Sequence, residues 1–443
     1  MDQFTITSKQ RNVLFGFMGL GLLCMIITFF ADDMFHTRFW TNYLHNSVFF
    51  TGIAFMALFI LSAFTTALAG WHTLIKRIWE AYSMFLIPGL ILMAVVVIGT
   101  VGHLHHLYHW TDTAEVAEDP VLSGKSGFLN VTWYTAGTII IMGIWIFFAW
   151  KLRQLSLDED KNGTADFDHH RRIRIWSAAF LPIAGFSSAA IIWQWIMSID
   201  AHWYSTLFAW YTGASWFVAA MALTIIMIAY MKGKGYLPNV TQEHLHDLGK
   251  YLFAFSIFWT YLWFSQYMLI WYGNVGEETV YFQERQQHYP VLFYGNLLLN
   301  FIAPFFVLMR NDTKRKYGTM IFASVVVFFG HWWDFFQMIK PGARLTAMEA
   351  MAHHGHGEGG HHAAEHAGEV LPGHTEAAMH AMPFEMGFTI PGFLELGTML
   401  GFLALFIYVV FNQLSKAPLT PKNDPYLEES LHHHVEMHEE GAH

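Results

Sequence analysis

The amino-acid sequence predicts an all-α integral membrane protein with about ten transmembrane helices. Of its 443 residues, 54% are apolar and only 13% are charged, whereas roughly a quarter of the residues in an average soluble domain are charged. Long apolar runs recur along the chain, and each can cross about 30 Å of hydrocarbon as a helix. A soluble protein of this size needs more charge to cover its surface. The composition therefore excludes a soluble globular protein and a disordered chain.

Ten apolar runs carry the predicted transmembrane helices. The first follows Lys9 and Arg11 as a signal peptide would, but it lacks a small-residue cleavage site, so we interpret it as a retained helix. The predicted transmembrane domain covers residues 1–415. The runs lie at 12–31, 47–69, 82–102, 131–150, 176–199, 207–231, 251–273, 289–309, 318–338 and 388–411.

The distribution of Lys and Arg predicts the orientation of these helices. With the N-terminus placed inside, 19 of the 24 Lys and Arg residues fall in inside segments and 5 fall in outside loops. Cytoplasmic loops of membrane proteins carry such an excess of positive charge. We therefore expect a multi-pass protein with both termini in the cytoplasm.

Charge and cysteine content exclude several classes of partner and cofactor. The net charge of −10 leaves no basic face for nucleic acid. The single cysteine, Cys24, excludes a disulfide framework, a Cys-ligated iron–sulfur cluster and covalently attached haem. A b-type haem needs two axial ligands on facing helices, and only His331 lies clearly within an expected span. We therefore expect no redox cofactor, metal site or catalytic residue of this chain's own.

Two polar segments interrupt or follow the helices. The segment 339–387 is expected to be an external loop insertion, and it holds eight of the 27 His residues between His353 and His380. Such a tract either binds Zn²⁺ or Cu²⁺ or is a solvated low-complexity insertion. Residues 416–443 are expected to form a polar cytoplasmic tail. Residues 241–249 resemble a short interfacial helix that leads into the seventh span.

Ionisable residues within the spans are functional candidates, because a charge at the bilayer centre costs at least about 2.5 kcal/mol. The ninth span carries His331, Asp334 and Gln337 on one helix face. One interpretation is a proton relay or a polar quinone contact in which Asp334 orients or charges His331. The other is a structural His–Asp pair near the surface.

Further polar candidates lie at the helix ends and inside two other spans. Asp200 and His202 follow the fifth span, where they mark either a proton exit or an ordinary helix end with an aromatic belt. The remaining candidates for a proton path are Glu277 outside, Glu80 on the inner side, and Gln194 and Gln266 between them.

Three stretches closely resemble the ActF-type membrane subunit of alternative complex III, which is similar to the NrfD/polysulfide reductase C-like family. They are 196–211 (IMSIDAHWYSTLFAWY), 244–250 (HLHDLGK) with its continuation 258–272 (FWTYLWFSQYMLIWY), and 124–130 (GKSGFLN). The resemblance covers roughly residues 70–340 well and the last helix loosely. It implies ten transmembrane helices, eight of them in two four-helix bundles.

The resemblance also implies a role in a complex. Alternative complex III is a quinol:cytochrome c oxidoreductase of the respiratory chain in the bacterial inner membrane, and a quinol such as menaquinol is its reductant. The implied partners are a second NrfD-like subunit, a multihaem cytochrome c, an iron–sulfur protein and a terminal oxidase. Haem c and iron–sulfur clusters belong to those partners. This chain is therefore not expected to be catalytic alone, and proton translocation and complex assembly are its implied roles.

Three hypotheses follow for the function of the chain. In the first, Asp200, His202, His331 and Asp334 form part of a proton path. In the second, the chain is a purely structural scaffold that faces the quinone pool. In the third, suggested by the His tract, it is a metal-ion transporter, but transporters place their ligands near the midplane of the bilayer, where the expected spans carry no Asp, Glu or His.

Overall fold

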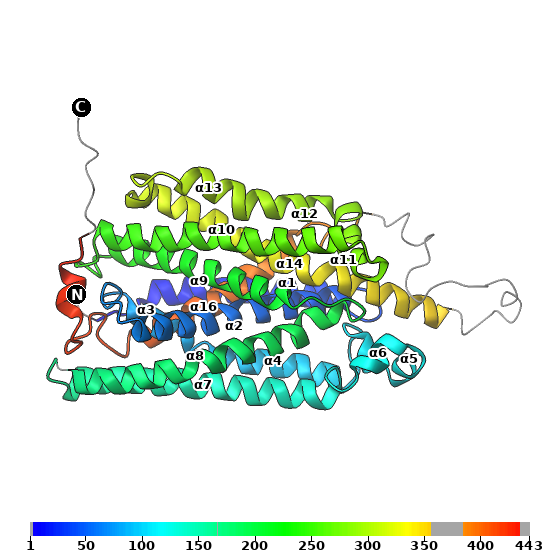
Figure 1. Ribbon diagram of the computed structural model, residues 1–443, viewed down its shortest axis with the longest axis horizontal. Coiled ribbons are helices and arrows are strands. Elements are labelled where there is room, and N and C mark those ends of the chain that lie inside the picture. Colours follow the sequence, from blue (N-terminus) through cyan, green and yellow to red (C-terminus); the bar gives the residue numbers. More distant parts are fainter. Residues whose placement is uncertain (1–2, 166, 356–383, 435–443) are drawn as a thin grey trace, which may run out of the picture.

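All named elements in the part of the chain that the structure describes are helices (Figure 1). The structure is a computed structural model that describes residues 3–165, 167–355 and 384–434, apart from the side chains of 349 and 351–355. The predicted all-α class is confirmed. The long helices are α1 (Ser8–Phe30), α2 (Thr37–Thr66), α4 (Leu86–Val101), α7 (Val131–Asn162), α8 (Phe167–Trp195), α9 (Leu207–Gly233), α10 (Gln242–Gly273), α14 (Tyr317–Gly355) and α16 (Phe393–Leu414).

Shorter helices complete or connect the long ones. Helix α3 (Lys76–Ser83) continues into α4, and α12 (Pro290–Leu297) joins α13 (Ala303–Leu308) through a π-helical segment, η3 (Leu298–Ile302). The connecting helices are α5 (Thr113–Glu118), α6 (Pro120–Lys125), α11 (Gly276–Gln287), α17 (Leu427–Leu431) and the 3₁₀ turns η1 (His109–Thr111), η2 (Met197–Ile199) and η4 (Thr313–Arg315).

Nine helices of the described residues are long and apolar enough to cross a membrane. They include the composite spans α3–α4 and α12–α13. Helix α10 has 32 residues and packs on α9, but its many Trp and Tyr residues lower its hydropathy. These nine spans and α10 correspond to the ten predicted runs, and the chain is a multi-pass membrane protein.

The helices form two groups of four and one pair. In the first group, α2, α3–α4, α7 and α8 pack on one another, and in the second group, α9, α10, α12–α13 and α14 do so. Helices α1 and α16 pack together as a pair. Helix α2 also contacts α9 and α14, so it joins the two groups. We call the second group the second bundle.

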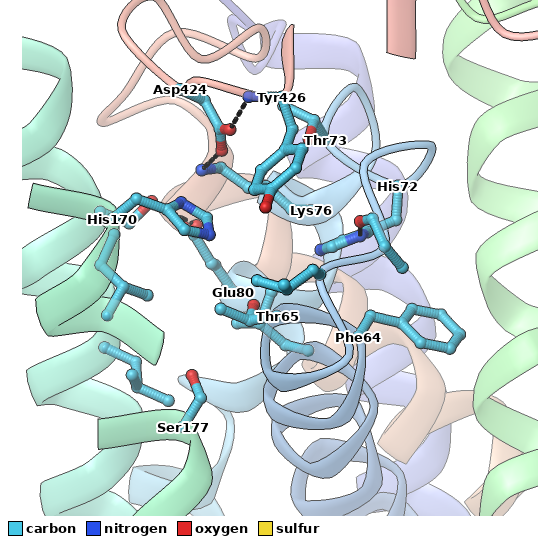
Figure 2. Close-up of a pocket in the computed structure, with 16 residues that line it drawn as sticks. Phe64, Thr65, His72, Thr73, Lys76, Glu80, His170, Ser177, Asp424 and Tyr426 are labelled. Carbon is cyan, nitrogen blue, oxygen red and sulfur yellow. Dashed lines mark hydrogen bonds and ion pairs between the residues drawn. The ribbon is translucent and has the colours of Figure 1, made fainter. Parts of the chain in front are cut away.

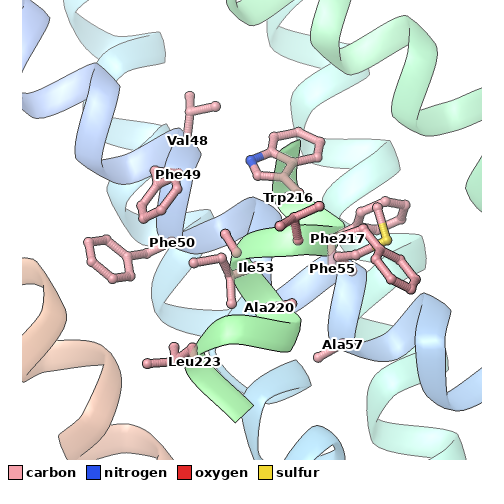
Figure 3. Close-up of a cluster of buried hydrophobic side chains, with 14 of the residues drawn as sticks. Val48, Phe49, Phe50, Ile53, Phe55, Ala57, Trp216, Phe217, Ala220 and Leu223 are labelled. Atoms are coloured by element: carbon pink, nitrogen blue, oxygen red, sulfur yellow. The ribbon is translucent and has the colours of Figure 1, made fainter. Parts of the chain in front are cut away.

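Close packing of α2 against α9 forms the centre of the protein (Figure 3). Phe55 of α2 and Trp216 of α9 lie in one cluster of buried side chains. A Cβ atom built on Gly52 would overlap the indole ring of Trp216. Glycine is therefore required at position 52, because any larger residue would push the two helices apart.

The first and last described residues of the chain lie at the same end of the helices (Figure 1). Gln3 Nε2 donates a hydrogen bond to the carbonyl oxygen of Ser415 at 2.8 Å. Helix α3, the turn between α7 and α8 and the described residues 416–434 also lie at this end, which we call the tail end. Helices α5, α6 and α11 lie at the opposite end.

Three predicted boundaries differ from the structure. Helix α14 continues to Gly355, so residues 339–355 are helical rather than part of an external loop. Residues 242–249 are the first turns of the continuous helix α10, not a separate interfacial helix. Helix α2 begins at Thr37, ten residues before the predicted run. Most of the His tract, residues 356–380, lies outside the described residues.

Candidate functional site

Asp334 of α14 is a fully buried carboxylate in the second bundle. Its Oδ2 accepts a hydrogen bond from Trp259 Nε1 of α10 at 3.0 Å. Its Oδ1 accepts one from Asn296 Nδ2 of α12 at 2.7 Å and another from the hydroxyl of Tyr211 of α9. In the described parts of the chain, no basic side chain forms an ion pair with it. Directed donors from three helices therefore hold this carboxylate, and we call these four residues the Asp334 site.

His331 lies one helical turn from Asp334 but has a different partner. Its Nδ1 lies 2.8 Å from Ser215 Oγ of α9, and its ring meets the edge of Trp259 with centroids 5.4 Å apart. The second ring nitrogen, Nε2, is buried without a hydrogen-bond partner. No hydrogen bond or ion pair joins His331 to Asp334 among the described residues. Asp334 was predicted to orient His331, but the residue that contacts the His331 ring nitrogen is Ser215.

A second amide extends the Asp334 site along the π-helical segment. Asn300 Nδ2 donates to Asn296 Oδ1 at 2.6 Å and to the carbonyl oxygen of Gly330 at 2.9 Å. Asn300 Oδ1 is buried without a partner. A Cβ atom on Gly330 would lie 2.9 Å from Leu299 Cβ and would overlap the Asn300 amide. The π-helical turn and the missing Cβ together let this amide reach the α14 backbone.

A small hollow lies beside the Asp334 site, toward the opposite end of the bundle. Tyr211, Gln266 and Gln337 line it, together with Tyr281 of α11 and Met338 of α14. Gln266 and Gln337 are both buried, and Gln337 Oε1 has no hydrogen-bond partner. Polar side chains therefore line the hollow, among them the tyrosine that binds Asp334.

Asp200 pairs with Arg285 at the outer side of this hollow. Arg285 Nη2 lies 2.9 Å from Asp200 Oδ2, and the guanidinium stacks on the Tyr281 ring at 3.4 Å from its centroid. Arg285 also donates to the carbonyl oxygen of Gln337 at 3.3 Å. Burial opposes the charge of Arg285, but Asp200 and Tyr281 raise its pKa above the ordinary value. The guanidinium of Arg285 therefore keeps its charge.

His202 does not join Asp200, although the two are neighbours in sequence. Its Nε2 lies 2.5 Å from Asp119 Oδ2 at the N-terminus of α6, and its side chain is 46% exposed. Although burial alone would raise the pKa of Asp119, the hydrogen bonds from His202 and from backbone amides of α6 lower it. His202 therefore belongs to the surface of the opposite end.

Three other predicted residues lie apart from the Asp334 site. Glu277 is exposed in the first turn of α11. Gln194 is buried at the end of α8 with neither side-chain polar atom bonded, next to Gly137 of α7. Glu80 lies at the tail end, where Arg77 Nη1 and Ser156 Oγ contact its carboxylate at 2.6 and 2.7 Å. The structure thus brings together only part of the predicted path.

The expectation that His331 alone lies within a span is wrong. His45 of α2 is fully buried, its Nε2 lies 2.9 Å from the Trp332 carbonyl oxygen, and its ring stacks on the Trp332 indole. Sequence reasoning missed His45 because the apolar run begins at residue 47, whereas α2 begins at Thr37. Facing helices therefore offer two buried His residues, each already packed against side chains.

A second buried ionic group joins α2, α14 and α16. Arg38 pairs with Glu395 at 2.8 Å, and Asn42 Nδ2 donates to the same carboxylate at 3.0 Å. Lys340 is fully buried and donates to Thr41 Oγ1 at 2.7 Å. Sequence reasoning placed Lys340 in a loop, but these contacts hold it within α14. The group packs the α1–α16 pair onto the bundles.

A network of charged side chains closes the tail end (Figure 2). Lys76 of α3 lies 3.4 Å from Glu159 Oε2 of α7 and pairs with Asp424 of the tail. Burial alone would raise the pKa of Asp424, but Lys76 lowers it. His72 lines a small hollow beside this network, together with Lys76 and Asp424. Burial, together with the charge of Lys76, lowers the pKa of His72 to about 4.

Some residues in and around the Asp334 site could be recognised from the sequence. Asn296 and Asn300 are an i, i+4 amide pair inside an apolar run, which marks a shared polar face. Tyr211, Ser215 and Trp259 could not be recognised in this way, since such residues are common in membrane helices.

Comparisons with known proteins find no matching protein-family model and no matching curated protein.

Proposed function

We propose that this chain is an integral membrane subunit of a respiratory quinol:cytochrome c oxidoreductase of the alternative complex III type, and that its second bundle conducts protons. Asp334 is the observation that carries the proposal. An ionisable side chain inside a membrane protein is expensive and is retained mainly for transport, proton transfer or charge movement. Asp334 has no counter-charge in the described residues, so gaining or losing a proton changes the net charge of its site.

Polar groups continue from Asp334 in both directions along the second bundle. Toward the opposite end lie Tyr211, the hollow with Gln266 and Gln337, and the pair of Arg285 with Asp200. A path of this kind needs groups that accept and donate in turn, and hydroxyl and amide groups do both.

Toward the tail end, Asn296 and Asn300 follow Asp334. Beyond them, Ser324 of α14 and Ser256 of α10 are buried with hydroxyls that lack a partner. Ser324 precedes His331 by two helical turns, roughly 10 Å along the axis. These hydroxyls support a continuation of the path on that side.

The stretches of resemblance coincide with this line of residues. Residues 196–211 contain Asp200 and Tyr211, and residues 258–272 contain Trp259 and Gln266. The proposal therefore includes the partners that the resemblance implies: a second NrfD-like subunit, a multihaem cytochrome c and an iron–sulfur protein, which hold the haem and clusters. It also places both termini in the cytoplasm of a bacterium, at the tail end.

Isolation of the tagged chain from its native membrane tests the assignment to a complex. In mild detergent, we expect multihaem cytochrome and iron–sulfur subunits to co-purify and to give c-type haem bands in the visible spectrum. A colourless chain that purifies alone would contradict the assignment. Substitution of Asp334 then separates proton conduction from a scaffold role, because a pure scaffold predicts altered assembly with unchanged proton stoichiometry.

A further inference from the structure

Three metal-ligating side chains from distant parts of the sequence meet at the tail end. They are Glu159 near the end of α7, His170 near the start of α8 and Asp424 of the tail. One ligand atom from each lies within 4.8 Å of the others. All three residues are buried. Such a meeting of one imidazole and two carboxylates has the ligand types and spacing of a divalent metal site.

The side chain of His170 supplies independent evidence for a ligand. It is 9% exposed, and neither ring nitrogen has a hydrogen-bond partner. Its Nδ1 lies 3.5 Å from Glu159 Oε1, and this oxygen also lacks a hydrogen bond. Buried polar atoms without partners are costly. A bound cation would give a partner to one ring nitrogen of His170 and to Glu159 Oε1, since a metal ion binds a neutral imidazole nitrogen and a carboxylate oxygen together.

The charges around these residues also favour an added cation. Four carboxylates and three basic side chains form the network, so it holds one excess negative charge when His170 is neutral. Lys76 forms ion pairs with both Glu159 and Asp424, and it contacts Glu159 Oε2 rather than the Oε1 atom that faces His170. The ammonium therefore leaves Glu159 Oε1 and the His170 ring without a hydrogen-bond partner. The network consists of Glu80, Glu159, Asp160, Asp424, Lys76, Arg77 and Arg153.

We propose that Glu159, His170 and Asp424 bind a divalent first-row transition-metal ion that fastens the C-terminal tail to the turn between α7 and α8. The imidazole favours such an ion over Ca²⁺ and Mg²⁺, which prefer oxygen ligands. The site is independent of the proposed proton path, because its residues lie at the tail end and not in the second bundle.

Mn²⁺ is a suitable probe, because carboxylates suit Mn²⁺ whereas His-rich segments favour Zn²⁺ and Cu²⁺. The full chain, purified in detergent, is titrated with Mn²⁺ and followed by electron paramagnetic resonance. We expect saturable uptake of one ion per chain, with spin-echo modulation from an imidazole nitrogen. His170→Gln should remove this modulation and weaken binding roughly tenfold or more. His169→Gln, the matched neighbour on the same helix, should change neither.

A variant that binds Mn²⁺ more tightly than the wild-type chain provides a test that a folding defect could not mimic. Lys76→Met removes the ammonium that competes for Glu159 and Asp424, so Mn²⁺ should bind more tightly to this variant. Bound Mn²⁺ should also slow proteolysis of the tail in the wild-type chain, and a chelator should restore it. The absence of saturable uptake, or an imidazole signal that persists in His170→Gln, would overturn the proposal.

Discussion

The indole nitrogen of Trp259 donates a hydrogen bond to Asp334 Oδ2 at 3.0 Å and thereby joins α10 to α14. Two other helices send donors to the other oxygen of the same carboxylate, from Tyr211 and Asn296. Asp334 is therefore both the meeting point of four helices and a fully buried carboxylate of the second bundle. Its structural and proposed functional roles can be separated by changing its donors and its charge in turn.

Trp259→Phe should lower the stability of the purified protein without removing the carboxylate. The change deletes one hydrogen bond to a charged group, and such bonds contribute about 1.5–3 kcal/mol. Trp263→Phe is the control, because Trp263 lies one turn further along α10 and its indole makes no hydrogen bond among the described residues. Thermal unfolding in detergent measures both. Equal losses would show that the bond to Asp334 contributes little.

Gly330→Ala should destabilise the π-helical segment. The new Cβ would overlap the Asn300 amide and crowd Leu299, and overpacking of this kind typically costs about 1–3 kcal/mol. Gly318→Ala in the same helix meets nothing within 4 Å, so it should leave stability unchanged or raise it. A melting temperature of Gly330→Ala equal to that of Gly318→Ala would mean that the Asn300 contact can relax freely.

Gly21→Ala should loosen the pair formed by α1 and α16. A Cβ atom at position 21 would lie 2.6 Å from Gly401 Cα, so the two backbones could no longer approach as closely. Gly16→Ala in the same helix meets nothing within 4 Å and serves as the control. Cross-linking of cysteines placed across the pair should become slower only in Gly21→Ala. Unchanged cross-linking would contradict the close approach.

His105 should make stability depend on pH below neutrality. It is buried against Trp40 in the loop after α4, and this burial, with smaller effects of neighbouring His residues, lowers its pKa from 6.5 to about 4. The folded state then binds fewer protons than the unfolded state between these values, so stability present above pH 6.5 is lost as the pH falls toward 4. The loss amounts to roughly 3 kcal/mol for this group.

His105→Gln removes this contribution and should flatten the pH dependence of unfolding between pH 6.5 and 4. His103→Asn is the control, because His103 is exposed and has a left-handed backbone that Asn tolerates. If both variants kept the wild-type slope, the buried ring of His105 would not be the titrating group.

The transmembrane helices could be predicted because each one corresponds to a long apolar run in the sequence. Their ends could not, because the residues that extend them are polar and are held by distant partners. The charge of Lys340 predicts a loop residue, but in the structure Lys340 lies within α14 and donates a hydrogen bond to Thr41 of α2. His45 was overlooked for the same reason, since its place in α2 depends on contact with Trp332.

The candidate site was predictable only where polar residues stand within apolar runs. Asp334, His331 and Gln266 were found in this way, and they do lie in the second bundle. The partners of Asp334 come from three other helices, and the spacing of residues along one helix does not predict them. In the tail-end network, Lys76 forms ion pairs with Glu159 and Asp424. These residues are far apart in the sequence, so their contact could not be predicted from it.

Proton transfer through Asp334 is the step on which the proposed function depends. The measurement is the number of protons released per electron when the proposed complex, isolated from the native membrane and reconstituted in vesicles, oxidises quinol. Asp334→Asn keeps the size of the side chain and removes its charge, whereas Glu277→Gln removes an exposed carboxylate as a control. We expect Asp334→Asn to assemble and to release fewer protons per electron, while Glu277→Gln keeps the wild-type ratio. An unchanged ratio in an assembled, active Asp334→Asn complex would contradict the claim.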